Sequence, residues 1–167
     1  MALVIRSQEP GDGDGLARVW QSAGRYYAEL APDLFQVPVS DGPSFELGSV
    51  PLGKQDEGNT LRLVAEADGT IAGWLSARLE PPVPAPERQL VKELGWPRLM
   101  VDALVVDRSL WRQGIGGALL SAAEQWGRER GANVVRLDTY ADGPVAVPFY
   151  EQRMGYHRRA IIFEKKL

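Results

Sequence analysis

The stretch ALVVDRSLWRQGIGGALL, residues 103–120, joins an apolar run to an amphipathic run through a glycine-rich turn. Residues 99–106 are apolar apart from Asp102, which is typical of a central strand covered on both faces. Residues 115–130 have the spacing of a helix, and Gly131 is placed to end it. Its apolar stripe comprises Ile115, Leu119, Leu120, Ala123 and Trp126. The sequence therefore predicts a strand, a tight turn and a helix in succession.

The turn itself, residues 112–117, reads RQGIGG. Free backbone amides at the start of a helix carry the positive end of the helix dipole, so they bind phosphate groups. Gly114 and Gly116 would let a ligand approach the backbone because they lack a Cβ atom. Arg112 adds a fixed positive charge that suits a diphosphate and is equally at home on a protein surface. A glycine turn before a helix is also a common structural element, and both interpretations stand at this point.

The first half of the chain alternates between strand and helix patterns. Residues 2–6 predict a short strand, and Asp12 or Asp14 is placed to cap a helix. The apolar positions of that helix are Leu16, Val19, Trp20, Ala23, Tyr27 and Leu30. The pattern of residues 31–59 does not assign them to a helix or a strand. Residues 61–67 and 71–79 predict an antiparallel pair of strands joined at Asp68-Gly69, a two-residue hairpin signal.

The second half continues the alternation. The stretch EPPVPAPERQ at residues 80–89 carries four prolines, which predict an exposed loop. Beyond residue 130, we expect a strand at 134–140, a short helix at 145–154 ended by Gly155, and a closing strand at 156–166. The fold class is therefore α and β mixed, with a sheet that is not necessarily all parallel.

Composition excludes several kinds of chemistry. A chain of 167 residues favours one domain, and 44% hydrophobic with 25% charged residues is typical of a globular protein. With no cysteine there is no disulfide, no zinc–thiolate site and no thiol nucleophile. Since His157 is the only histidine, a histidine-rich metal site is also excluded, and we expect a solvated or packed side chain there.

Charge and hydropathy restrict the partners and the compartment. A net charge of −3 argues against nucleic-acid binding, although the acidic excess lies before residue 84 and a basic excess after it. There is no run of about 18 apolar residues, so we expect no membrane-spanning helix. The first ten residues lack the features of a signal peptide, and we expect a cytoplasmic protein.

Three other ligand motifs fail on their residues. GSVPLGK at 48–54 has the spacing of a P-loop, but Gln55 stands where a magnesium-binding serine or threonine is required. The dinucleotide motif G-x-G-x-x-G is broken because Leu119 follows Gly114 and Gly116. GDGDG at 11–15 lacks the later acidic ligands of a calcium loop.

Residues 103–120, together with LDTYADGPVAVPFYEQRMGY at 137–156, resemble the acetyl-CoA-binding half of the GNAT superfamily of N-acetyltransferases. The resemblance is dense over residues 99–156. It implies one three-layer domain over residues 1–167, with helices on both faces of a central, twisted, mixed and mostly antiparallel sheet. It further implies that residues 99–167 bind acetyl-CoA and residues 1–98 bind the acceptor. The implied activity is transfer of an acetyl group to a primary amine of a small molecule or peptide.

The resemblance also assigns roles to residues. The family's Arg/Gln-x-x-Gly-x-Gly/Ala motif, which binds the coenzyme pyrophosphate, matches here except that Trp111 replaces its first residue. The family's Asn-x-x-Ala-x-x-Phe-Tyr motif matches except that Gly143 replaces the asparagine. The strand end would hold the pantetheine arm through main-chain groups. The implied coenzyme-binding residues are Leu104, Val105, Val106, Arg112, Gln113, Gly114, Ile115, Gly116, Gly117, Ala146, Phe149 and Tyr150.

By resemblance, Tyr150 is the general acid that protonates the departing thiolate, and a tyrosine hydroxyl with a pKa of about 10 suits that role. Asp102, a single acid in an apolar strand, is our first candidate for the general base because burial would raise its pKa, and Asp138 is the second. Either acid is equally a structural hydrogen-bonding group. We expect no metal. A homodimer is compatible with the pattern, and the alternative function is a non-catalytic acyl-CoA-binding sensor or regulatory module.

Overall fold

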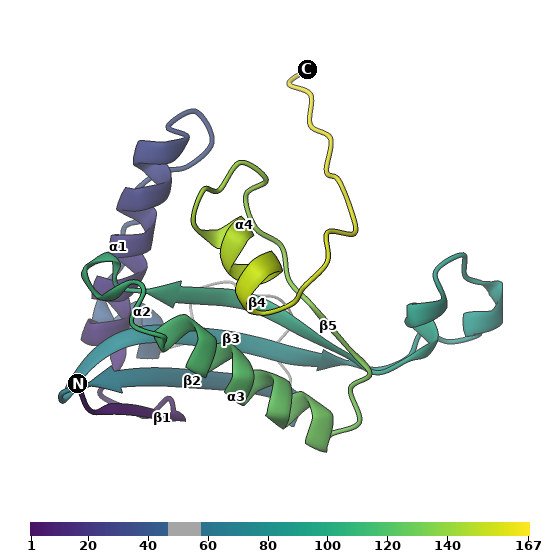
Figure 1. Cartoon of the computed structure of the whole chain (residues 1–167), viewed down its shortest axis with the longest axis horizontal. Helices are drawn as coiled ribbons and strands as arrows, with labels where there is room; N and C mark the ends of the chain where they lie inside the picture. The colour runs from purple at the N-terminus through teal and green to yellow at the C-terminus, as the bar shows by residue number, and fades with distance from the viewer. Residues whose placement is uncertain (47–57) are drawn as a thin grey trace. The chain divides into compact units, whose positions relative to one another are not determined.

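The computed structural model describes residues 1–46 and 58–167 and contains a five-stranded sheet in the order β1-β2-β3-β4-β5 (Figure 1). The strands are β1 (Leu3–Ser7), β2 (Thr60–Ala67), β3 (Thr70–Glu80), β4 (Arg98–Val106) and β5 (Val134–Arg136). The first four pair antiparallel and β5 pairs parallel with β4, so the sheet is mixed and mostly antiparallel, as expected. The GSVPLGK stretch lies outside the described residues.

The predicted hairpin between β2 and β3 is confirmed. Asp68 and Gly69 both have positive φ, at 49° and 77°. This is the backbone conformation of the two-residue turn whose twist matches that of the flanking strands. On β2, Leu61, Leu63, Ala65 and Ala67 are buried as predicted, and Val64 between them is buried as well, so the alternation is not strict.

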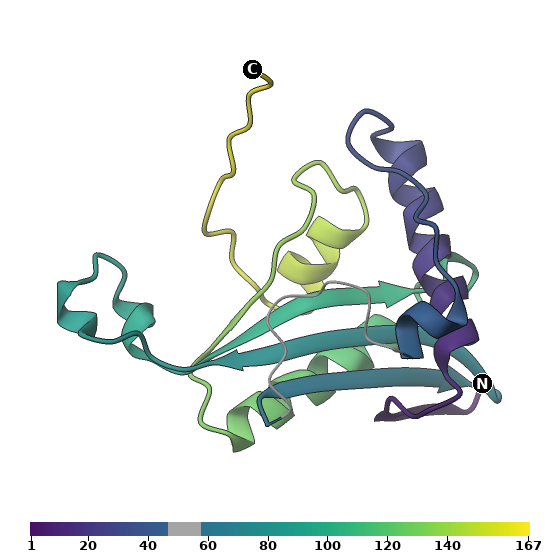
Figure 2. The ribbon, with the colours of Figure 1, turned by 180° about the vertical axis from the view of Figure 1, so that it is seen from behind.

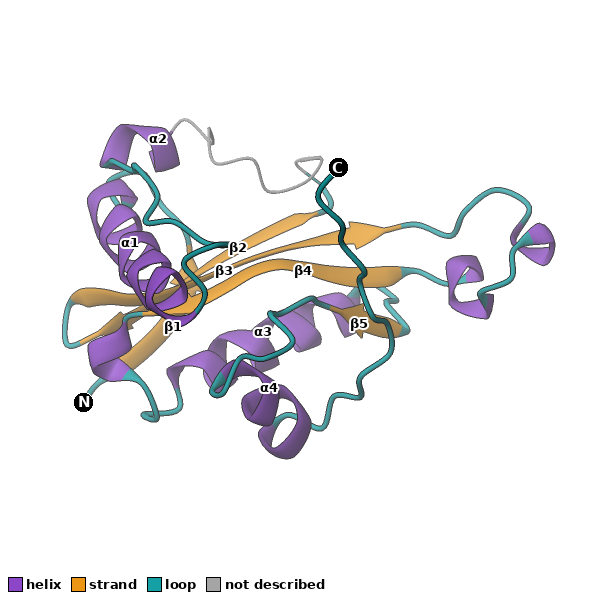
Figure 3. Cartoon of the chain, turned by 90° about the horizontal axis from the view of Figure 1, so that it is seen from above, coloured by secondary structure: helices purple, strands orange, loops and turns teal. Residues whose placement is uncertain are grey.

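Helices cover both faces of the sheet (Figure 3). They are α1 (Gly13–Leu30) and α2 (Gly42–Glu46) on one face and α3 (Ile115–Glu129) on the other. Phe45 of α2 packs against Trp74 of β3, with ring centroids 5.5 Å apart. A Cβ atom at the next-door Gly73 would instead lie 3.1 Å from the side chain of Leu119 on α3. Because successive residues of a strand point to opposite faces, these contacts show that α2 and α3 cover opposite sides of β3.

Local signals predicted α3 and its end correctly. Ile115, Leu119, Leu120 and Ala123 are all fully buried. At the C-terminus, Gly131 has a φ of 82°, and its N–H donates to the carbonyl of Arg128 at 3.1 Å. The N–H of Ala132 donates to the carbonyl of Gly127 at 2.9 Å. These two bonds form a Schellman motif, in which a glycine with positive φ satisfies the last carbonyls of a helix.

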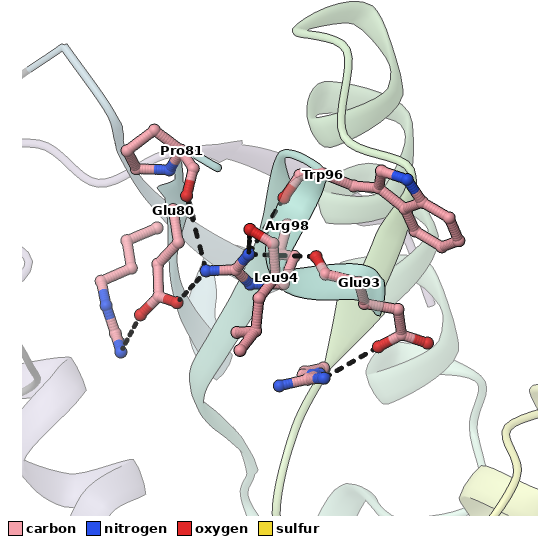
Figure 4. A network of polar contacts seen from close by, with 8 residues as sticks. Glu80, Pro81, Glu93, Leu94, Trp96 and Arg98 are labelled. Atoms are coloured by element: carbon pink, nitrogen blue, oxygen red, sulfur yellow. Dashed lines mark hydrogen bonds and ion pairs between the residues drawn. The ribbon is translucent and has the colours of Figure 1, made fainter. Parts of the chain in front are cut away.

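The proline-rich connection from β3 to β4 is mostly exposed, as predicted, and contains two short 3₁₀ turns, Pro86–Arg88 and Lys92–Gly95. Its ends are fixed by Arg98, which is only 3% exposed (Figure 4). The Arg98 guanidinium donates to the carbonyls of Pro81, Glu93, Leu94 and Trp96 and to the carboxylate of Glu80. The buried arginine therefore acts as a multiple backbone donor that closes the base of the connection.

The chain divides into two compact units, Met1–Leu137 and Asp138–Leu167, and the sheet belongs to the first. In the second unit, α4 (Ala146–Pro148) continues into a single π-helical turn, Phe149–Arg153, and Gly155 follows with a φ of 74°. The helix predicted at 145–154 is thus confirmed in position, with a wider last turn.

Two predicted strands are wrong in extent or existence. The strand expected at 134–140 ends at Arg136, where its pairing with β4 ends. Residues 156–166 form no strand, and Ile161, Ile162 and Phe163 are exposed. Apolar and β-branched residues favour a strand only where a neighbouring strand supplies hydrogen bonds and packing, and the sequence pattern does not report that neighbour.

Asp12 stands at the predicted N-cap of α1, but its side chain makes no capping bond. It instead accepts two bonds of 2.8 Å from the Arg6 guanidinium and one of 2.7 Å from the N–H of Glu9. The Arg6 guanidinium holds the pKa of Asp12 below its ordinary value. This buried carboxylate therefore ties β1 to the start of α1.

We predict that Asp12→Asn lowers the free energy of unfolding by about 2 kcal/mol at pH 7, because charge-assisted bonds to a buried group are lost. The pKa of Asp12 is lower in the folded state, so its contribution is present above the unfolded value of about 3.9 and is lost as the pH falls through the folded value. Urea denaturation at pH 7 and at successively lower pH measures both effects. Asp33→Asn, at an exposed position, is the control. A difference from wild type that does not shrink in acid contradicts this account.

Candidate functional site

The turn from β4 to α3 has open space beside Gly114. Gly114 has a φ of 85°, and a Cβ atom placed on it would meet nothing within 4 Å. The first hydrogen bond of α3 runs from the N–H of Ala118 to the carbonyl of Gly114, at 3.0 Å. The amides of Ile115, Gly116 and Gly117 therefore have no acceptor within the helix. Arg112 has a φ of 63°, which is rare for a residue with a side chain, and it is exposed beside them.

Among the residues that the structure describes, the C-terminal part of β4 has a sheet partner on one edge only. β5 pairs with β4 through residues Arg98, Leu99 and Met100, whereas β3 continues to pair with β4 as far as Val106. Within the first unit, the main chain of Leu104 and Val105 thus lies on a strand whose other edge carries no ladder. Figure 1 shows β5 ending early along β4. An open strand edge of this kind can hydrogen-bond an extended ligand through the backbone.

Asp102 occupies a β-bulge in β4. Ser76 pairs with Ala103 and Ala77 pairs with Val101, so Asp102 between them has no opposite residue on β3. A bulge re-aims the side chain at its centre and often lies beside a functional site. Asp102, the first candidate for the general base, therefore differs from its neighbours on β4 in backbone geometry as well as in charge.

The expected apolar surroundings of Asp102 are wrong. Its carboxylate forms an ion pair with Arg78, and both side chains are largely buried. Arg78 also contacts Glu80 at 3.1 Å, and the other oxygen of Glu80 contacts Arg98 at 3.2 Å. The surroundings of Asp102 are therefore charged, with the carboxylate balanced by an arginine. Arg78 lies on a neighbouring strand, and no short spacing in the sequence connects it with Asp102.

Trp111, which replaces the first polar residue of the family's motif, bonds within the protein. Its indole Nε1–H donates to the carbonyl of Val106 at 2.9 Å. Its ring lies edge-on to the ring of Tyr26 on α1, with centroids 4.7 Å apart. The bond closes the turn onto the end of β4 and occupies one acceptor position of the Val106 carbonyl.

One face of α1 contacts the same turn. Its four residues, spaced by four, four and three, are Arg18, Ser22, Tyr26 and Glu29. Arg18 forms an ion pair with Asp107 at 2.6 Å, the N–H of Arg108 donates to Ser22 Oγ at 3.2 Å, and the guanidinium of Arg108 contacts Glu29 at 2.6 Å. This face was not predicted from the sequence, although its residues are spaced as on one side of a helix.

In the second unit, Ala146, Phe149 and Tyr150 lie on the turn formed by α4 and the π-helical segment, and all three are half-buried. The rings of Phe149 and Tyr150 are 5.1 Å apart. A Cβ atom at Gly143 would lie 3.0 Å from the carbonyl oxygen of Tyr140. A side chain at Gly143 would therefore require the carbonyl of Tyr140 to shift slightly.

The remaining candidate residues are exposed. Asp138, the second candidate for a general base, follows the end of β5 and is exposed instead of lying on a strand. His157 is exposed, in agreement with the expected solvated side chain. Among residues 1–46 and 58–167, no three His, Cys, Asp or Glu side chains are grouped to hold a metal ion. Across the same residues, no helix has both the length and the apolar character needed to cross a membrane.

Comparison with known proteins gives a consistent answer. Residues 25–156 match the model of the Acetyltransferase (GNAT) family. No curated protein matches the sequence. A mutant of the BH1408 protein of Bacillus halodurans is 19% identical, covers 98% of this chain and 99% of its own, and superposes with a TM-score of 0.79.

Two further solved structures share the fold. A transcriptional regulator of Bacillus halodurans is 22% identical, with a TM-score of 0.68 and coverage of 99% of this chain and 100% of its own. An aminoglycoside acetyltransferase from an uncultured soil metagenomic sample, in complex with sisomicin, is 20% identical, with a TM-score of 0.61 and coverage of 99% and 96%. At these identities the likeness establishes the fold alone.

We predict that Arg78 and Asp102 stabilise the fold as a pair. In a double-mutant cycle of Arg78→Met and Asp102→Asn, we expect a coupling of about 2 kcal/mol in the free energy of unfolding, because both charged side chains are largely buried. Chemical denaturation measures it. The control pair is Arg158 with Glu151, of which the arginine side chain is 69% exposed, and it should couple much less because water screens it. Equal coupling in the two cycles would contradict the assignment.

Proposed function

Since the chain belongs to the GNAT family of acetyl-CoA-dependent acetyltransferases, we propose that it transfers the acetyl group directly to a primary amine of a small molecule or peptide. The observation that carries the proposal is the start of α3, where three amides without helical acceptors adjoin open space at Gly114. In this proposal residues 99–167 serve the coenzyme and residues 1–98 the acceptor.

Backbone groups hold the coenzyme in this proposal. The amides of Ile115, Gly116 and Gly117 bind the diphosphate, supported by the helix dipole and by Arg112 and Gln113. These residues fit a diphosphate because the turn is open beside Gly114 and residues 112–117 include no acid. Main-chain groups of Leu104, Val105 and Val106 pair with the pantetheine arm, with Val106 offering one fewer acceptor position because Trp111 uses the other.

The transfer step needs no covalent enzyme intermediate. The acceptor nitrogen forms a bond to the acetyl carbon while a main-chain N–H near Val105 stabilises the oxyanion, and the carbon–sulfur bond then breaks. Tyr150 supplies the proton to the sulfur, and Ala146 and Phe149 line the coenzyme beside it. Asp102 accepts the proton that the amine loses, directly or through water, with Arg78 keeping its carboxylate in place.

The acceptor is chosen by the first half of the chain. Two acids of the acceptor-side half, Glu29 and Glu80, are engaged by Arg108, Arg78 and Arg98. The polycationic acceptor class suggested by the aminoglycoside acetyltransferase would therefore meet two acids that are already paired. An acceptor with one ammonium group directed at Asp102 fits the charge distribution better.

A second candidate function is a non-catalytic acyl-CoA sensor. Trp111 and Gly143 replace two polar residues of the family's coenzyme motifs, and both replacements favour this alternative. Release of free thiol from acetyl-CoA across a panel of amines separates the two functions. Turnover with any amine supports the enzyme, and coenzyme binding without turnover for every amine supports the sensor.

We predict that Tyr150→Phe lowers kcat about a hundredfold and leaves the KM for acetyl-CoA nearly unchanged, because the ring remains and only the proton donor is removed. Steady-state thiol release measures both constants. Tyr156→Phe is the matched control, since the ring of Tyr156 lies 6.0 Å from that of Tyr150 in the same unit. Retention of full kcat in Tyr150→Phe would exclude it as the general acid.

We also predict that Arg112→Ala weakens binding of coenzyme A about fivefold at low salt and less at high salt, because an exposed charge pair with phosphate is screened by ions. Isothermal titration calorimetry measures the dissociation constant. Arg128→Ala, in the last turn of α3, removes the same charge from the opposite end of the helix and should bind normally. Equal losses in both variants would point to net charge instead of a local contact.

A further inference from the structure

The turn that precedes α3 is fixed mainly from one side, by α1. Arg18, Ser22 and Glu29 contact its first two residues, Asp107 and Arg108. Tyr26 supports both ends of the turn, with the Arg108 guanidinium 5.4 Å above its ring and the Trp111 ring edge-on at 4.7 Å. Figure 2 shows α1 beside the end of β4 from which the turn departs.

We propose that Trp111 is a positioning residue, which locks the coenzyme-binding turn between α1 and the end of β4 and so presets the amides that bind the diphosphate. The proposal rests on the proposed function. It gives a role to Trp111, whose side chain carries no charge and uses its N–H within the protein. Trp111 acts on coenzyme binding through Val106 and Tyr26, not by touching the coenzyme.

The backbone that follows Trp111 needs such support. Arg112 adopts a φ of 63°, a left-handed conformation that costs a residue with a side chain about 1 kcal/mol or more. Such a conformation persists only when neighbouring contacts impose it. The bond from the Trp111 indole to the Val106 carbonyl joins the residue before Arg112 to the end of β4, at 2.9 Å. It thereby fixes the chain before Arg112, whereas α3 fixes the chain after it.

Trp111 and Tyr26 contact each other through their aromatic rings. Burial raises the pKa of Tyr26, so its hydroxyl stays neutral, and no partner for that hydroxyl is recorded within residues 1–46 and 58–167. Edge-to-face packing between two aromatic rings contributes beyond the apolar area that they bury. Since α1 belongs to the half assigned to the acceptor, this contact is also a physical link between the two substrate sites.

Trp111→Phe is the sharpest test, because it keeps an aromatic ring at the position that contacts Tyr26 and removes the N–H donor together with the five-membered ring that carries it. We expect binding of coenzyme A to weaken about fivefold, the effect of one net hydrogen bond. The KM for acetyl-CoA should rise by a similar factor while kcat at saturation stays unchanged, because the turn lies at the diphosphate and not at the thioester. Trp96→Phe, which makes the same change at a side chain on the β3–β4 connection, should match wild type.

Two more variants address the alternatives. Ser22→Ala removes the acceptor on α1 of the Arg108 N–H and changes no residue of the turn itself. It should also weaken coenzyme binding. Trp111→Gln restores a polar residue of the family's motif and should bind more weakly than Trp111→Phe, because it loses the ring contact as well. Tighter binding by Trp111→Gln would overturn the proposal, since residue 111 would then act best by direct contact.

The readouts separate this proposal from the proposed function. Thermal unfolding without ligand reports stability, and calorimetry with coenzyme A reports binding. Wild-type binding together with unchanged binding in Trp111→Phe and Ser22→Ala overturns the positioning role alone, even if both variants are less stable. Absence of coenzyme A binding by the wild type overturns the positioning role and the proposed function together.

Discussion

The site depends on where the β4–β5 ladder ends. Parallel pairing begins at Arg98 and stops at Met100, so among the described residues β4 pairs only with β3 from Val101 onward. A strand with one unpaired edge has main-chain donors and acceptors that do not bond to a neighbouring strand. The start of α3 likewise has open space beside Gly114. An open strand edge and an open helix start together give the geometry expected to bind an extended ligand with a charged end.

The base of that ladder is fixed by charge. Arg78, Glu80 and Arg98 form a continuous run of ion pairs, and Asp102 at the bulge extends it. Burying one charge without its partner would be costly, but alternating signs let these side chains lie between strands and the connecting loop. Asp102 therefore belongs to a structural network of alternating charges. Its carboxylate is paired with Arg78, a neighbour that the sequence pattern does not reveal.

Elements specified by nearby residues were predictable, and elements specified by distant ones were not. Asp68 and Gly69 define their turn by backbone conformation alone, and Gly131 ends α3 for the same reason. The strand expected at residues 156–166 is absent because strand formation needs a partner, which no local pattern supplies. The pairing of Arg78 with Asp102 was missed for a related reason, since it joins two strands across a bulge.

The two departures from the family's motifs stand in different local surroundings. At Gly143 a Cβ atom would lie 3.0 Å from the carbonyl oxygen of Tyr140, so a side chain there would require that carbonyl to shift. At Trp111 the replacement gains a hydrogen bond and an aromatic contact that the shorter polar side chains of the motif do not provide in the same form. Judged by the family's motifs alone, both replacements remove a contact with the coenzyme. The structure separates a position with a close backbone neighbour from one whose side chain bonds and packs within the protein.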